Sequence, residues 1–174
     1  MMTKFVRFNT FLLVGLALLA MTTSCGSMGH KKKKPLTTLE LHIEVGSDNS
    51  GTTESVPIFR ESPIYITVDK ESFLDGEDLE EAKVMDELGG YVIRLKFNWR
   101  GTQVLSGMTT ANRNRRIAVL CGFGQTRWLA APKIEKPIMD GVLRFTPDCS
   151  REEADKIAEG LNNVVAELKK EDKF

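Results

Sequence analysis

The chain is short of the residues on which most hydrolytic and metal sites depend. It has two histidines, three cysteines, two tryptophans and two tyrosines in 174 residues. His30 lies in a polar stretch, so His42 would have to serve every catalytic triad. His42 alternates with Leu41 and Ile43, which predicts a side chain on the exposed side of a strand. Two thiols without nearby histidines do not make a zinc site. We therefore expect no catalytic residue, cofactor or metal.

Loops that hold phosphates or calcium are also missing. Gly122-Phe-Gly124 lacks the third glycine and the strand-to-helix context of a dinucleotide loop, and it fits a hairpin turn better. The acidic run from Asp75 to Glu81 lacks the order of ligands and the central glycine of an EF-hand. We interpret it as a solvated turn.

The chain has no excess of charge of either sign, with 24 basic and 24 acidic residues. Six of the basic residues precede Pro35, which leaves 18 against 24 acidic residues and a net charge of −6 for the rest. An acidic domain is a poor candidate for electrostatic binding of nucleic acid, and we expect none.

One apolar run stands out, and no later run reaches membrane length. Lys4 and Arg7 precede the run Phe11–Ala20, and small or hydroxyl residues then lead to Cys25. This is the layout of an export signal, with a cysteine where a lipoprotein is cleaved and acylated. Residues 1–25 are therefore predicted to be a lipoprotein signal peptide, with Cys25 as the lipid attachment site.

Two alternatives remain for this segment. Ser24 and Gly26 fit a lipoprotein signal, but Thr22 stands where leucine is usual. An uncleaved amino-terminal anchor and ordinary soluble secretion both fit the same residues. All three place the remaining chain outside the cytoplasm, and the lipoprotein prediction places it in a bacterial cell envelope, facing the periplasm from the outer or inner membrane.

Residues 26–36 are predicted to be a tether that contains the run Lys31–Lys34. Four lysines beside a membrane attract acidic lipid headgroups, by about 1 kcal/mol each at the surface. A plain soluble linker explains the run equally well.

Cys121 and Cys149 remain once Cys25 is assigned to lipid. An exported compartment permits a disulfide between them. Cys121 lies in an apolar strand, so a buried free thiol is an equal alternative.

Residues 37–174 are predicted to form one α+β domain. The patterns that indicate strands are mostly alternations of apolar and polar residues, in 39–45, 64–68, 82–85, 91–97, 116–121, 127–132 and 142–145. Residues 46–55 are predicted to be a polar loop, and Gly89-Gly90 to be the turn of a hairpin.

Two helices are expected beside these strands. Asn98 is a good N-cap for the first, which ends before Asn112. Ser150 and Glu153 have capping-box spacing at the start of the second, whose apolar residues follow at helical spacing. Strands in the majority with two amphipathic helices predict a two-layer α+β sandwich, with both helices on one face of a mostly antiparallel sheet.

From about residue 73 to 168 the chain resembles the periplasmic head of SecD, a subunit of the bacterial Sec export machinery. Three ordered segments carry the resemblance: DLEEAKVMDELGGYVIRLKFNWRGTQVL, TTANRNRRIAVLCGFGQTRWLAAPKIEKPI and GVLRFTPDCSREEADKIAEGLN. The first is similar to a SecD segment in which two strands lead into a helix. The second is similar to a segment with Thr-x-x-Asn, then Ile-Ala-Val and then Ala-Pro. The third is similar to a segment that contains a hydroxyl-capped helix.

The chain also departs from the SecD pattern. Cys121-Gly122 replaces the usual Asp-Gly, and Gly141–Phe145 lacks the usual Ile-x-Gly. The membrane helices through which SecD works with SecF are missing. The resemblance therefore implies the fold and contact with exported or envelope polypeptides, without proton-driven pulling.

Two surface features are candidates for binding. Arg113, Arg115 and Arg116 crowd one turn and are candidates for contact with an anion or a partner. Trp99 and Trp128 are candidate interface aromatics. A solvated turn and a place in the core are the plainer interpretations.

The leading hypothesis is a non-enzymatic, membrane-tethered interaction protein, with Sec translocase components or exported polypeptides as partners. The competing hypotheses are a small-ligand or hydrolytic lipoprotein and a purely structural envelope protein. A cleft that gathers Arg100 with Arg113, Arg115 and Arg116 would favour the small-ligand function.

Overall fold

A computed structural model of the chain describes residues 34–46 and 51–171, which belong to one compact unit. The predicted signal peptide, Cys25 and most of the tether lie outside the described residues. The elements, in chain order, are β1 (Thr38–Ile43), β2 (Thr53–Ile58), β3 (Ile64–Asp69), β4 (Leu74–Asp75), a 3-10 turn η1 (Gly76–Asp78), β5 (Leu79–Glu87), β6 (Gly90–Phe97), α2 (Trp99–Ala111), β7 (Ile117–Phe123), β8 (Gln125–Ala130), β9 (Val142–Phe145) and α3 (Arg151–Glu171).

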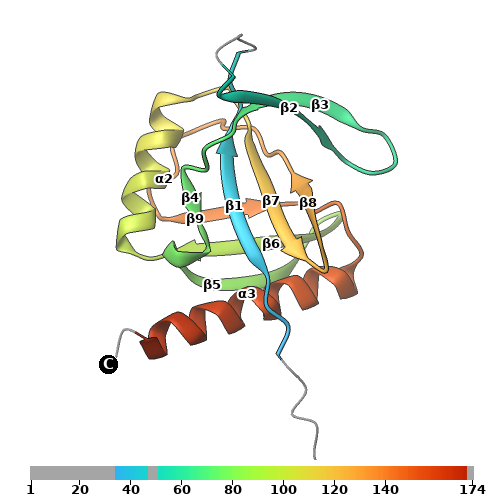
Figure 1. The fold of residues 1–174 in the computed structure, drawn as a ribbon, viewed down its shortest axis with the longest axis vertical. Coiled ribbons are helices and arrows are strands. Elements are labelled where there is room, and N and C mark those ends of the chain that lie inside the picture. Colours follow the sequence, from blue (N-terminus) through green and yellow to red (C-terminus); the bar gives the residue numbers. More distant parts are fainter. Residues whose placement is uncertain (1–33, 47–50, 172–174) are drawn as a thin grey trace, which may run out of the picture. The chain divides into compact units, whose positions relative to one another are not determined.

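Two antiparallel sheets enclose the main core. One has the strand order β4-β1-β7-β8, and the other has the order β5-β6-β9. The strands of the second sheet cross those of the first at a steep angle in Figure 1. Leu41 and Val119 from the first sheet and Ile93 and Leu95 from the second are completely buried in the shared core. Alternate residues of each strand point inward, as the sequence pattern requires.

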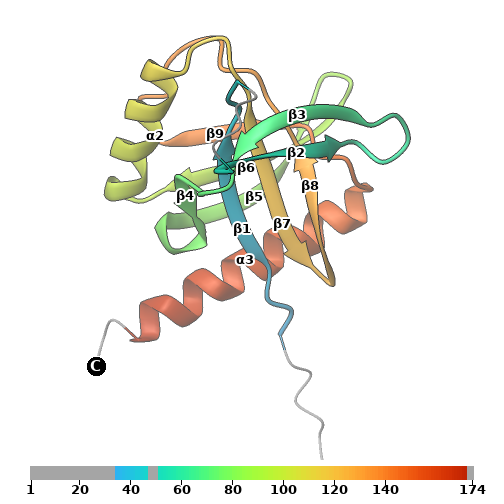
Figure 2. The same ribbon diagram turned by 45° about the horizontal axis from the view of Figure 1, so that its top comes forward.

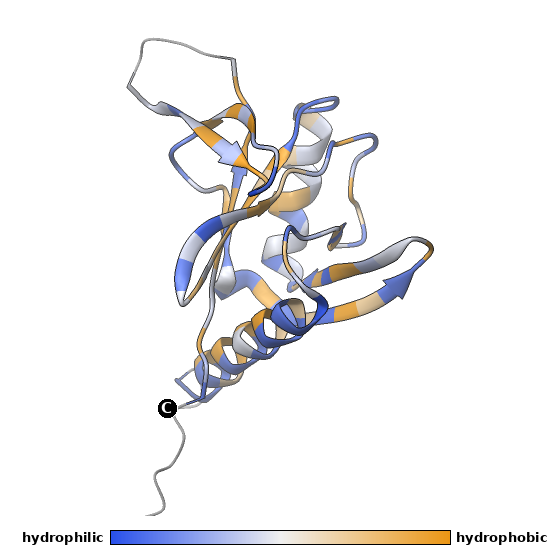
Figure 3. Ribbon diagram, turned by 90° about the vertical axis from the view of Figure 1, so that its right-hand side faces the viewer, coloured by the Kyte–Doolittle hydropathy of each residue, from blue (hydrophilic) through white to orange (hydrophobic). Residues whose placement is uncertain are grey.

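Two helices complete the main core. Asn98 caps α2, since its side chain accepts a hydrogen bond of 2.8 Å from the amide of Gly101. The Ser150 hydroxyl accepts one of 3.2 Å from the amide of Glu153 at the start of α3. Polar and apolar bands alternate along α3 in Figure 3, and its apolar positions are buried. Both predicted helices and the mixed α+β class are confirmed.

The arrangement of the strands is more divided than the sequence indicated. We expected one sheet with a helical face, but the described strands form three antiparallel sheets. The third sheet is the β2–β3 hairpin, which crosses β7 and β8 near one end in both Figure 1 and Figure 2. Its residues Val56, Ile58, Ile66 and Val68 form a second core cluster with Ala118 and Ala131.

This hairpin changes the environment of His42, for which the sequence prediction was wrong. The residue is 4% exposed because the hairpin covers the second face of the β1–β7 pair. Nδ1 donates a 2.9 Å hydrogen bond to the carbonyl oxygen of Asp69. The ring also lies edge-on to Trp128, with centroids 5.1 Å apart. His42 is therefore a satisfied core residue.

The strand β2 was missed altogether. Its first residues fall in the predicted polar loop, and Pro57 removes a backbone donor. Pairing with β3, from Thr53 opposite Asp69 to Ile58 opposite Ile64, holds the segment as a strand. In the described part of the chain, no helix is both long and apolar enough to span a membrane.

Candidate functional site

The loop between β2 and β3 carries the most unusual backbone of the described residues. Phe59 has a φ of 71°, in the left-handed region that a bulky residue rarely occupies. Its side chain is still 39% exposed. Strained positions of this kind cluster at functional sites, which makes the loop a candidate site.

Phe59 borders an open hollow of about 540 Å³. The wall opposite Phe59 comes from the end of β8 and from β9. We call this the Phe59 hollow, and its lining residues are Phe59, Glu87, Val92, Ala130, Ala131, Pro132, Arg144, Phe145 and Thr146. Six of the nine lining side chains are apolar, but four of these six are buried, so the hollow presents polar and apolar surface in similar amounts.

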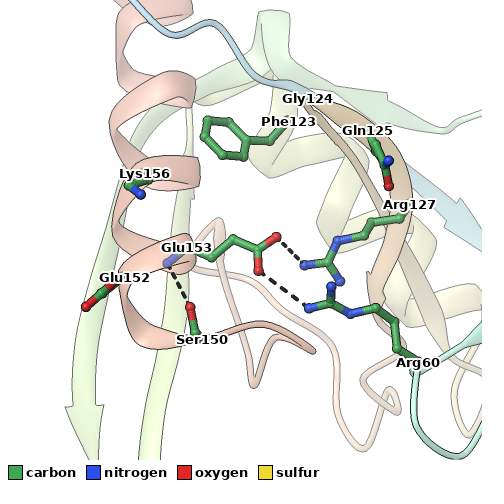
Figure 4. A pocket seen from close by; sticks show the side chains of 9 residues that line it. All are labelled: Arg60, Phe123, Gly124, Gln125, Arg127, Ser150, Glu152, Glu153 and Lys156. Carbon is green, nitrogen blue, oxygen red and sulfur yellow. Dashed lines mark hydrogen bonds and ion pairs between the residues drawn. The ribbon is translucent and has the colours of Figure 1, made fainter.

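The next residue, Arg60, belongs to a charged cluster (Figure 4). Arg127 Nη2 lies 2.6 Å from Glu153 Oε1, and Arg60 Nη2 lies 3.5 Å from Glu153 Oε2. The Arg60 amide donates a 2.8 Å hydrogen bond to Asp148 Oδ2. Arg127 also donates one of 2.6 Å to the Asp148 carbonyl oxygen. The cluster thus joins the β2–β3 loop, β8 and the start of α3.

The two arginines lower the pKa of Glu153. Burial raises the pKa of this carboxyl, but the hydrogen bond and charge of Arg127 and the charge of Arg60 outweigh burial. The pKa therefore lies below its ordinary value of 4.5, and Glu153 is ionised at neutral pH. An open hollow of about 350 Å³ adjoins the cluster. The two arginines and Glu153, which line this hollow, are already paired with one another.

The two tryptophans have different environments. Trp99, the first residue of α2, is 80% exposed. Trp128 is half-buried against the second core cluster and lines a hollow of about 430 Å³ with Pro57, Phe59 and Pro63. Trp128 therefore closes the core and still reaches the surface around Phe59.

The arginine turn is solvated but not isolated. Arg115 Nη1 donates a 3.4 Å hydrogen bond to the Glu44 carbonyl oxygen, and the Arg116 amide donates one of 2.8 Å to the Glu44 carboxylate. Arg113 is exposed, without a polar partner among the described residues. Arg100 instead pairs at 2.9 Å with the buried Asp78.

This arrangement does not gather the arginines in one cleft. Arg100 and Arg113 lie at opposite ends of α2, about 20 Å apart at 1.5 Å per residue. The geometry proposed for a small-ligand function is therefore not present.

The two remaining cysteines are free thiols in the structure. Burial raises the pKa of Cys121 to about 12 and that of Cys149 to about 11, and the charge of the Cys149 thiolate adds to the shift of Cys121. Both are protonated at neutral pH, and the thiol is a poor nucleophile. A disulfide between them stays a prediction.

Neither catalytic nor metal chemistry emerges from the described residues. No group of three or more His, Cys, Asp or Glu side chains among them is placed to hold a metal ion. Phe59 and Arg60 were not predicted from the sequence, because Arg60 and Glu153 are 93 positions apart. A Phe-Arg pair in a short polar loop has no local signature, and only the fold brings it to β8 and α3.

Comparison with known proteins agrees with this fold. The SecDF P1 head subdomain family matches residues 53–163, whereas the sequence resemblance began near residue 73. No curated protein matches. One solved structure of SecDF, described as a membrane component that enhances protein export, is 22% identical with a TM-score of 0.53 over 74% of this chain.

A second solved structure, of SecDF in a super-membrane-facing form, is also 22% identical and has a TM-score of 0.54 over 74% of this chain. The chain spans 63% of the first structure's length and 19% of the second's. At 22% identity, the similarity to these two structures shows the fold alone. The family match extends from β2 into α3 and covers well over half of the chain. The chain therefore belongs to the SecDF P1 head subdomain family.

Proposed function

We propose that this protein is a non-enzymatic envelope protein whose head binds extended polypeptides as an accessory to protein export. The observation that carries the proposal is Phe59, an apolar side chain held exposed by a strained backbone at the edge of an open hollow. Exposed apolar surface of this kind is typical of interaction sites. The related SecDF, a membrane component that enhances protein export, supports the choice of partner.

The second part of the proposal is the mode of attachment. A lipid on Cys25 and the lysines of the tether would hold the head at a membrane. Tethering raises the local concentration of the head near partners at that membrane. Sec translocase components and exported chains are then the partners within reach.

Binding of polypeptide is tested by replacing Phe59 with a photo-crosslinking phenylalanine analogue in the full chain. We expect it to crosslink to a purified unfolded exported polypeptide and not to the folded form of the same polypeptide. The same analogue at Gln103, an exposed position of α2, is the control. Equal crosslinking at both positions, or none at Phe59, would refute the proposed site.

The attachment is tested separately with Cys25→Ser. We expect the unchanged chain to incorporate radioactive palmitate and to sediment with membranes, and the variant to do neither. A variant that keeps both properties would show that the chain is held in another way.

A further inference from the structure

Three cations lie side by side across the outer face of the β5–β6–β9 sheet. Lys83 is directly opposite Arg94, and Arg94 is directly opposite Arg144. Only Arg94 has a carboxylate partner among the described residues, Glu81 at 2.7 Å. Like charges directly opposite one another are destabilising. A domain with a net acidic charge therefore keeps a row of positive charge that ends at β9, and only the middle cation of the row has a carboxylate partner among the described residues.

Among the described strands, β9 pairs with β6 alone, so no other described strand covers its outer edge. The amide of Phe97 donates a 3.0 Å hydrogen bond to the Gly141 carbonyl oxygen, so these two residues form a hydrogen-bonded pair. Such pairs alternate along an antiparallel ladder, which puts the amide and carbonyl of Arg144 on the side away from β6. Arg144 is exposed, and β9 pairs with β6 alone. One backbone donor and one acceptor are therefore available at this edge.

Another open hollow, of about 190 Å³, lies beside this edge, and we call it the Lys136 hollow. Leu143 and Arg144 line one wall, and the segment from Pro132 to Ile138 lines the other. This hollow shares Pro132 and Arg144 with the Phe59 hollow, so the two adjoin along β9.

The charges that line the Lys136 hollow are mostly positive. Lys133 and Lys136 are exposed and have no ion pair among the described residues. With Arg144 they outnumber Glu135, the carboxylate of this lining. The hollow therefore extends the positive charge of the sheet face beyond the edge of β9.

We propose that an extended polypeptide adds to β9 as a further strand and carries Asp or Glu at the position opposite Arg144. This inference rests on the proposed function and gives it a register and a charge preference. The acidic side chain would complete the row Lys83, Arg94, Arg144, and its neighbours would lie near Lys133 and Lys136. Strand addition supplies main-chain hydrogen bonds for affinity, and the side chains supply specificity.

An anionic lipid surface would satisfy the same positive charges. It would not use the unpaired amide and carbonyl of Arg144 at a sheet edge. Nor would a flat surface enter the two hollows that share Pro132. The backbone therefore favours a polypeptide, and vesicles serve as the contrasting ligand in the test.

The test compares two labelled peptides on the full chain in detergent. One alternates Val with Glu and the other alternates Val with Gln. We expect the acidic peptide to bind about tenfold more tightly at low salt and to lose this advantage as salt screens the charges. Arg144→Glu should remove the preference and change binding of the neutral peptide less than about twofold. Lys156→Glu, the same charge change at an exposed lysine of α3, is the matched control.

Hydrogen exchange at the Arg144 amide provides a second measurement that does not depend on a variant. The acidic peptide should slow exchange of this amide, and vesicles of phosphatidylglycerol should not. Unchanged exchange with peptide bound, or protection by vesicles alone, would overturn strand addition. Equal binding of both peptides would overturn the acidic preference and leave the proposed function standing. If neither peptide binds, both fail.

Discussion

At the scale of single residues, Phe59 is the clearest conflict between local preference and the observed structure. A side chain with a Cβ atom in the left-handed region costs roughly 1–2 kcal/mol, and glycine avoids that cost. The neighbouring Arg60 holds the loop through its amide and guanidinium, at Asp148 and Glu153. The charged cluster therefore holds the loop in a backbone conformation that is unfavourable for phenylalanine.

Two substitutions at Phe59 separate the backbone from the ring. Both Phe59→Gly and Phe59→Ala remove the apolar side chain, but only glycine relieves the strain. We expect the glycine variant to be more stable than the alanine variant by about 1 kcal/mol, measured by urea unfolding. Both variants should lose polypeptide binding. The usual order, with alanine the more stable, would show that φ at this position is not strained.

At the scale of elements, α3 is held to the start of β1 by a very close approach. Thr37 is 1% exposed and lies against Gly160. A Cβ atom at Gly160 would lie 3.0 Å from Thr37 Cβ and 3.3 Å from its amide nitrogen. Three residues farther along α3, Asn163 donates a 3.0 Å hydrogen bond to the carbonyl oxygen of Pro35. The helix thus fixes the point where the tether enters the domain.

This contact predicts an unusual response to a helix-favouring substitution. Gly160→Ala should lower the free energy of unfolding by about 1–3 kcal/mol, because overpacking outweighs the gain in helix propensity. Gly107→Ala in α2 is the control, since a Cβ atom there meets nothing within 4 Å, and it should be neutral or stabilising by up to about 1 kcal/mol. Chemical unfolding of both variants measures the difference.

A double variant tests the cause of that loss. Thr37 Oγ1 is buried without a hydrogen-bond partner among the described residues. Thr37→Ala removes Oγ1, the atom nearest to a Cβ atom at Gly160, and should restore part of the stability lost in Gly160→Ala. Purely additive effects would show that the two residues do not interact.

At the scale of the whole molecule, Glu153 connects three separate parts of the fold. Its two arginine partners come from the β2–β3 loop and from β8, and its own backbone begins α3. Side chains in this cluster are partly exposed, so solvent screens the interaction. The geometry nevertheless makes Glu153 the residue through which acid should loosen the loop.

The pH dependence follows from the lowered pKa of Glu153. The ionised carboxylate is stabilising in the fold, so its contribution is complete above the unfolded value of 4.5. It is lost as the pH falls through the lower folded value. We expect the unchanged chain to be more stable than Glu153→Gln near neutral pH and the difference to close in acid, measured by urea unfolding over this range.

A neighbouring glutamate provides the control. Glu152→Gln removes the same charge from an exposed side chain without an ion-pair partner among the described residues. This variant should show no such pH-dependent difference. A gap between Glu153→Gln and the unchanged chain that persists in acid would mean that the ion pairs are not its cause.

Much of the fold was predictable from local patterns. The helices were found because capping at Asn98 and Ser150 and the helical spacing of apolar residues are local signals. β9 and the Gly89-Gly90 hairpin were also found from local signals, a short apolar run and a pair of turn residues. β2 was missed because Pro57 and its polar residues are unfavourable for a strand, and only pairing with β3 supports it. His42 was misplaced because alternation does not reveal whether a second layer covers the outer face.

The sequence by itself determined the mixed α+β class, the two helices, the resemblance to the SecD head and the acidic charge of the domain. These depend on neighbouring residues and on composition, which any single chain displays. The tertiary structure decided the division into three sheets, the burial of His42 and the meeting of Arg60, Arg127 and Glu153. It also aligned Lys83, Arg94 and Arg144, which come from three different strands. Contacts between distant segments depend on packing and strand register, and a local pattern contains no information about either.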